Sequence, residues 1–114
     1  MSKAIALLCL TITIAGCGTS TASSKPPVGD AAAGSRLFVQ EKCVTCHIVN
    51  GIGGNKAPEL TQNPIATDFN QLRAWLADPP AQMQYVKKLH LTDKQIANIS
   101  AFTGSKLKPA QGNP

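Results

Sequence analysis

Apolar residues recur with helical spacing in three separate stretches of the chain. The stretches are residues 30 to about 41, residues 68–78 and residues 92–104. In each one, small or apolar residues fall at intervals of three and four, which places them on one helical face. These residues are Gly34, Leu37 and Phe38; Phe69, Leu72, Trp75 and Leu76; and Ile96, Ile99 and Phe102 or Thr103. The pattern predicts a small all-α domain whose core is formed by these faces.

The ends of the predicted helices carry signals of their own. Asp30 is suited to cap the first helix, and a Pro-Pro pair at residues 79–80 stops the second. The third begins with Thr92-Asp93-Lys94-Gln95, a capping box, and Gly104 is a natural C-terminal stop. Residues 47–67, between the first two helices, are rich in Gly and Pro. A loop of that length in a compact domain is usually functional.

The N-terminus is typical of an export signal. A short positive start is followed by an apolar run over residues 4–15, too short to span a bilayer. The run ends in Ile14-Ala15-Gly16-Cys17, which resembles the lipobox of bacterial lipoproteins. That resemblance implies acylation of Cys17 and cleavage just before it. An ordinary signal peptide with an incidental Cys is the alternative.

The segment after Cys17 is rich in Ser, Thr, Pro and Lys, so it cannot bury enough apolar area to fold. We therefore expect a signal peptide at residues 1–16, a lipidated flexible tether at 17–29, the domain at 30–108 and a tail at 109–114. The lipid would hold the domain on the outer face of a bacterial cytoplasmic membrane.

Length and charge narrow the function classes. A chain of 114 residues suffices for one small domain, which often needs a metal, disulfides or a cofactor as a staple. The formal net charge is +5, and it falls to +4 once Lys3 leaves with the signal. This excess of positive charge is compatible with a solvated surface that binds nothing, with an anionic partner or with an anionic membrane. The basic residues are scattered, which argues against nucleic acid.

Position decides what the four cysteines do. Cys9 lies inside the signal and Cys17 is assigned to lipid, which leaves Cys43 and Cys46. They belong to Cys43-Val44-Thr45-Cys46-His47, the attachment motif for haem c. The two sulfurs form thioethers to the porphyrin, and the adjacent His47 becomes the proximal iron ligand. The sequence therefore predicts one covalently bound haem c.

Two other chemistries use similar residues. A Cys-x-x-Cys redox pair needs a βαβ setting, whereas no strand-like alternation surrounds this motif. A zinc site could combine Cys43, Cys46 and His47 with His90, but adjacent ligands at 46 and 47 strain a tetrahedron.

From residue 34 to residue 106 the chain resembles a class I (mono-haem, His/Met) cytochrome c. The resemblance rests on Gly34-Ser35-Arg36-Leu37-Phe38, Cys43 to His47, Gly53-Gly54 through Ala57-Pro58-Glu59-Leu60, Leu72-x-x-Trp75-Leu76-x-Asp78-Pro79, and Gln95-Ile96 through Ala101-Phe102. Lipoprotein cytochromes and the cytochrome c domains of haem–copper oxidase subunits are similar to it. The resemblance implies three to four helices wrapped around the haem.

The family also assigns roles to single residues. Gly34 and Phe38 would let the first helix cross the last closely, against Phe102. The carbonyl of Pro58 would accept the ring N–H of His47, and Trp75 would line the haem or its propionates.

Two side chains compete to be the sixth iron ligand. Met83 follows the proline pair and precedes the last helix, where the family places its ligand Met. The family usually has Pro directly after this Met, whereas Gln84 stands here. We expect Met83, with His90 or an open site as the alternatives.

A six-coordinate haem has no vacant position for a substrate, so we expect an electron carrier in a respiratory chain rather than an enzyme. The expected partners are a quinol-oxidising complex as donor and a terminal oxidase or reductase as acceptor. We expect the protein itself to be a monomer. Two alternatives stay open. The chain could be a haem subunit of a larger respiratory complex, or, with an open sixth site, a haem peroxidase or gas sensor.

Overall fold

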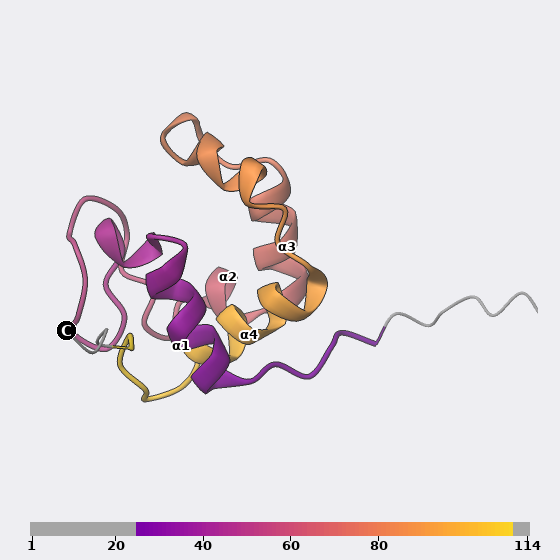
Figure 1. The fold of residues 1–114 in the computed structure, drawn as a ribbon, viewed down its shortest axis with the longest axis horizontal. Helices are drawn as coiled ribbons and strands as arrows, with labels where there is room; N and C mark the ends of the chain where they lie inside the picture. The colour runs from indigo at the N-terminus through magenta and orange to yellow at the C-terminus, as the bar shows by residue number, and fades with distance from the viewer. Residues whose placement is uncertain (1–24, 111–114) are drawn as a thin grey trace, which may run out of the picture.

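The computed structural model describes residues 25–110, so the predicted signal, the Cys17 boundary and the last four residues lie outside it. Within that range the chain is helical (Figure 1). Its elements are α1 (Ala31–Gln40), the 3-10 turn η1 (Cys43–Thr45), α2 (Pro64–Thr67), α3 (Phe69–Ala77), the 3-10 helix η2 (Ala81–Leu89) and α4 (Asp93–Thr103). The expected all-α fold is confirmed.

The predicted helix starts are confirmed at all three positions. Asp30 caps α1 by accepting a hydrogen bond from the backbone of Ala33, and Asp68 caps α3 in the same way. At α4 both bonds of the capping box are formed between Thr92 and Gln95. Each cap satisfies backbone donors that would otherwise lack a partner at the helix start.

The crossing of α1 and α4 is the most extensive contact between elements of the described fold. A Cβ placed on Gly34 would lie 1.9 Å from the carbonyl oxygen of Asn98, so only glycine allows this approach. The rings of Phe38 and Phe102 meet at the crossing, with centroids 5.4 Å apart and both side chains almost fully buried. The close crossing expected from the resemblance is therefore present.

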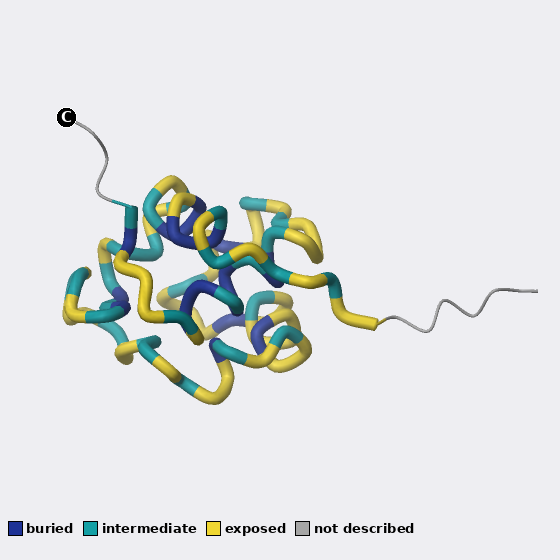
Figure 2. The backbone as a smooth tube through the Cα atoms, turned by 90° about the horizontal axis from the view of Figure 1, so that it is seen from below, coloured by how far each residue is buried: buried dark blue, intermediate teal, exposed yellow. Residues whose placement is uncertain are grey.

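The buried apolar residues form two groups, and Figure 2 shows most of the buried chain, in dark blue, toward the middle of the domain. One comprises Leu37, Leu72, Ile96 and Ile99 and joins α1, α3 and α4. The other comprises Phe38, Val49 and Phe102 and connects the crossing to the segment that follows η1. The apolar faces predicted for the three helices thus supply most of the core.

Two segments differ from the sequence-based expectation. Residues 47–67 end in a short helix, α2, because Asn63 accepts hydrogen bonds from the backbone of Ile65 and Ala66 and a proline fills the first helical position. Residues 81–89 form the 3-10 helix η2, in which only Val86 is buried. A 3-10 turn lacks the 3.6-residue period, so an apolar stripe could not have revealed it.

Both ends of the described chain are attached to the core. The backbone N–H of Asp30 donates to the side chain of Asn98 at 2.8 Å, and the ammonium of Lys94 bonds the carbonyl of Val28. At the other end the Ser35 hydroxyl donates to the carbonyl of Lys108 at 2.7 Å. No helix within residues 25–110 is long and apolar enough to cross a membrane.

Substituting Gly34 tests the helix crossing. Gly34→Ala should lower the free energy of unfolding by about 1–3 kcal/mol, because the new methyl group collides with backbone of α4. Gly104→Ala is the matched control, since its Cβ would meet nothing closer than 3.5 Å and its φ of −82° suits any residue. The control should be neutral or raise stability by up to about 1 kcal/mol. Equal urea midpoints for the two variants would contradict the crossing.

Candidate functional site

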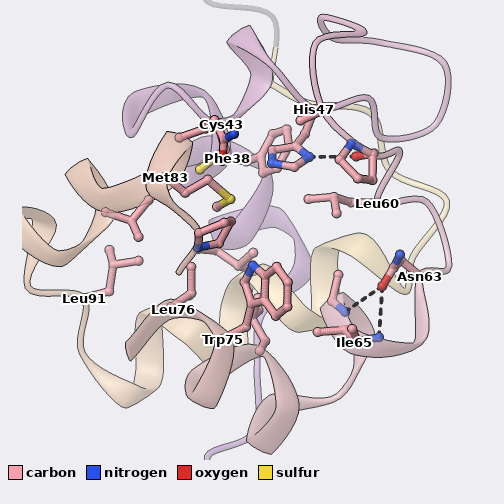
Figure 3. Close-up of a pocket in the computed structure, with 18 of the residues that line it drawn as sticks. Phe38, Cys43, His47, Leu60, Asn63, Ile65, Trp75, Leu76, Met83 and Leu91 are labelled. Carbon is pink, nitrogen blue, oxygen red and sulfur yellow. Dashed lines mark hydrogen bonds between the residues drawn. The ribbon is translucent and has the colours of Figure 1, made fainter. Parts of the chain in front are cut away.

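A cavity of about 420 Å³ opens between the helices and the loop after η1 (Figure 3). This volume lies within the range of cofactor and ligand sites, roughly 300–1,000 Å³. Most of its lining is apolar and comes from every part of the domain: Phe38, Cys43, His47, Lys56, Ala57, Pro58, Leu60, Asn63, Ile65, Ala66, Leu72, Trp75, Leu76, Pro80, Gln82, Met83, Val86, Leu89, Leu91 and Ile99. Such a lining suits a large apolar group.

The Cys-x-x-Cys-His segment forms a tight turn at one end of this cavity. Lys42 enters it in the left-handed conformation, with φ of 66°. The backbone N–H groups of Cys46 and His47 then both donate to the carbonyl of Cys43, at 3.2 and 3.0 Å. As a result Cys43 and His47 line the same cavity, with Cys46 half-buried beside them. Both cysteines are free thiols.

Two glycines hold this turn against the following loop. A Cβ on Gly53 or Gly54 would lie 2.0 Å from a carbonyl oxygen of the turn, that of His47 or that of Thr45. Gly53 also has φ of 136°, which side chains rarely adopt. The N–H of Gly54 donates to Val44 at 2.9 Å. The loop therefore supports the backbone that carries both cysteines and the histidine.

The imidazole of His47 is fixed in orientation and tautomer. The residue is 7% exposed, and its Nδ1 lies 2.7 Å from the carbonyl oxygen of Pro58. A carbonyl can only accept, so Nδ1 carries the proton and donates it. Nε2 is left with its lone pair, which is the form that binds a metal. Figure 3 shows this bond and the ring at the cavity.

Met83 and His90 occupy different places. Met83 lines the cavity from η2, and Figure 3 shows its thioether on the side of the cavity where Cys43 also lies. Its backbone N–H donates to Pro80 at 2.9 Å, and the side chain of Gln84 donates to Pro79 at 2.5 Å. His90 is exposed in the left-handed conformation at the end of η2 and borders a separate, smaller hollow.

The other sequence-predicted residue, Trp75, reaches the cavity from α3. It is 44% exposed, so one side contacts solvent while the other contributes to the lining. Figure 3 shows it with Asn63 and Ile65, away from the end where Cys43 lies. Pro58 and Trp75 thus both border the cavity, and the role of Trp75 beside a haem stays a prediction.

Burial changes the acidity of two groups. It raises the pKa of the Cys43 thiol from 9.0 to about 11, so this side chain is a neutral thiol at physiological pH. Burial is also the main cause that raises the pKa of Tyr85 on η2.

The residues present fit a haem better than a bare metal ion. Among residues 25–110 no three His, Cys, Asp or Glu side chains are placed to hold a metal together, which disfavours the zinc alternative. The cavity instead offers an apolar lining, an imidazole with a free nitrogen, a thioether and a thiol at its edge. These are the donors and the surroundings that a haem requires.

Comparison with known proteins identifies the family that the sequence resembles. The family model for cytochrome c matches residues 31–105, which is well over half of the chain. No curated protein and no solved structure matches the chain. The matched range includes the Cys43–His47 turn, the supporting loop, η2 and the α1–α4 crossing. The chain therefore belongs to the cytochrome c family, whose members bind haem c and transfer electrons.

Proposed function

We propose that this protein is a membrane-anchored electron carrier that cycles one covalently bound haem c between Fe(III) and Fe(II) in a respiratory chain. The observation that carries the proposal is the common cavity of His47, Met83 and Cys43, in which the ring of His47 is already held by Pro58. Family membership supports haem-based electron transfer. The covalent attachment, the ligand pair, the anchor and the respiratory role are our additions.

In this proposal Cys43 and Cys46 each form one thioether, and His47 and Met83 ligate the iron. The bound haem would supply a one-electron couple, whose potential a thioether ligand raises relative to a second imidazole. The protein holds the ligands rigidly and excludes water from the haem cavity. Pro58 prevents the imidazole from turning, the glycine-supported loop fixes the turn, and apolar side chains keep water out. A site held this way changes little when its charge changes, which suits rapid electron exchange.

The anchor and the partners extend the proposal beyond the described residues. We assign acylation to Cys17 on the basis of the Ile14-Ala15-Gly16-Cys17 boundary, which would place the domain on the outer face of a bacterial cytoplasmic membrane. A quinol-oxidising complex would donate electrons, and a terminal oxidase or reductase would accept them. Two ligands on the iron leave no position for a substrate, so the role is that of a carrier.

Attachment of the haem is tested through the two cysteines. The wild-type protein should keep its haem through denaturation and acid–acetone extraction, because thioether bonds survive both. Cys43→Ser and Cys46→Ser should each leave at most one thioether and shift the α band of the reduced spectrum. Cys9→Ser, inside the predicted signal, should change neither property. Haem that extracts freely from the wild type would refute covalent attachment.

The sixth ligand is tested by comparing Met83 with His90. Met83→Ala should open the iron to carbon monoxide and cyanide, whereas His90→Ala should leave the spectrum unchanged because His90 lies outside the cavity. Met83→His should lower the reduction potential by a sizeable part of the roughly 0.8 V that axial ligands span. A bond between a thioether and Fe(III) gives a weak absorption band in the far red. If the wild type lacks this band and binds carbon monoxide rapidly, the sixth site is open, and a peroxidase or sensor is favoured instead.

The anchor is tested by Cys17→Ala with Cys9→Ala as its control. Loss of the acylation site should move the haem protein to the soluble fraction or leave uncleaved precursor in the membrane. The Cys9 variant should fractionate like the wild type, since that residue leaves with the signal. Mass spectrometry of the mature N-terminus measures the modification directly, and an unmodified start at another residue would rule it out.

A further inference from the structure

The charge of the domain is unevenly distributed. Apart from Lys3, every basic and acidic side chain of the protein lies in residues 25–110, where the formal charge is +4. Five cations and two carboxylates belong to the two ends of the described chain and to α1 and α4, the helices that hold them. One of the carboxylates, Asp93, is paired with Arg73 of α3 at 3.0 Å. We call the six other residues the basic face: Lys25, Arg36, Lys94, Lys106, Lys108 and Asp30. Its formal charge is also +4.

Contacts across the fold place Arg36, Lys94 and Lys108 on neighbouring segments. Lys94 bonds the carbonyl of Val28, which attaches the N-terminal segment to the start of α4. The backbone N–H of Asp30 donates to Asn98 at 2.8 Å, which holds the start of α1, the helix of Arg36, against α4, the helix of Lys94. The bond from Ser35 to the carbonyl of Lys108 places the C-terminal segment beside α1.

The rest of the domain, which we call the balanced part, has no net formal charge. Its five cations and five carboxylates are Lys42, Lys56, Arg73, Lys87 and Lys88, and Glu41, Glu59, Asp68, Asp78 and Asp93. Two ion pairs lie within this set, Arg73 with Asp93 at 3.0 Å and Lys87 with Asp78 at 3.7 Å. The net charge of the domain is therefore carried by the basic face alone.

The basic face also exposes two large apolar side chains. Val28 is 78% exposed and Leu107 is 45% exposed, the latter between Lys106 and Lys108. Apolar side chains flanked by lysines match the interfacial layer of a bilayer, where acyl chains meet charged headgroups. In the rest of the domain the exposed large hydrophobic side chains are Ile65, Trp75 and Tyr85, and Ile65 and Trp75 line the cavity.

The basic face lies away from the cavity. In Figure 1 the segments at both ends of the described chain run along the lower edge of the domain, whereas η2 lies along the upper edge. Figure 2, seen from below, shows much of these two segments as exposed. Because η2 supplies Met83 to the cavity, a surface bound to the basic face would leave the cavity free.

We propose that the basic face docks on a bilayer surface of anionic phospholipid and holds the domain with its cofactor cavity turned away from the membrane. The proposal adds an orientation to the anchored carrier proposed above. The position of Cys17 favours lipid over an acidic protein, because only eleven residue steps separate it from Val28. Such a segment reaches at most about 40 Å when extended and averages about 18 Å as a random chain.

At that separation the membrane is the nearest large anionic surface. Its potential decays within about 8–10 Å at physiological salt, so the face gains attraction only when it lies almost on the headgroups. Each Lys or Arg there strengthens binding by about fivefold. The anchor supplies proximity, and the basic face supplies the orientation.

The test measures vesicle binding without the acyl chain. The haem-loaded protein carrying Cys17→Ser is sedimented with vesicles of phosphatidylglycerol and phosphatidylcholine, and with vesicles of phosphatidylcholine alone. Lys106→Gln with Lys108→Gln should weaken binding to the anionic vesicles by about 30-fold. The matched pair Lys87→Gln with Lys88→Gln removes the same charge from the balanced part and should change binding by less than about threefold.

Each other outcome overturns the proposal. Equal losses in the two pairs would mean that only net charge matters. Absence of binding to anionic vesicles would mean that the face does not recognise lipid. Unchanged vesicle binding, with slower salt-dependent electron exchange with an acidic redox protein, would assign the face to a protein partner. None of these results affects the haem site or the acylation of Cys17, which the spectra and the mass of the N-terminus report separately.

Discussion

The close approach of α1 and α4 is the constraint on which the rest of this structure depends. Two backbones meet at Gly34, where any side chain would collide with the carbonyl of Asn98. The approach brings Phe38 and Phe102 into contact, and Phe38 is at once part of the core and part of the cavity lining. The turn with both cysteines begins three residues after α1 ends, so the crossing also determines where that turn starts.

The loop after η1 has two tasks that depend on each other. Its glycines pack against the Cys43–Thr45 turn, and its Pro58 holds the ring of His47. It then ends in α2, whose Ala66 carbonyl accepts a bond from the buried hydroxyl of Thr103 on α4 at 2.9 Å. The loop is therefore attached to the core at both ends, although much of it lacks regular structure. Through this attachment an irregular segment can hold an imidazole in one orientation.

Sequence reasoning succeeded where a signal is local. Periodic apolar residues and capping side chains located α1, α3 and α4, because each depends on neighbours within one or two turns. It missed α2 and η2, which have no such period. Spacing alone left Met83 and His90 as alternatives, since only the folded chain shows which one borders the cavity. The predictions for residues 1–24 stay predictions.

The separation of charge described for this domain makes it an electric dipole. Its positive pole is the basic face at the chain ends, and the rest of the domain has no net formal charge. Near an anionic surface such a dipole experiences a torque before any contact forms, so the domain turns as it approaches. The rest of the domain, which includes the cavity, behaves differently, because charges that sum to zero exert little force beyond a Debye length. A redox partner would therefore reach the cavity by diffusion and short-range fit, at a rate that salt changes little.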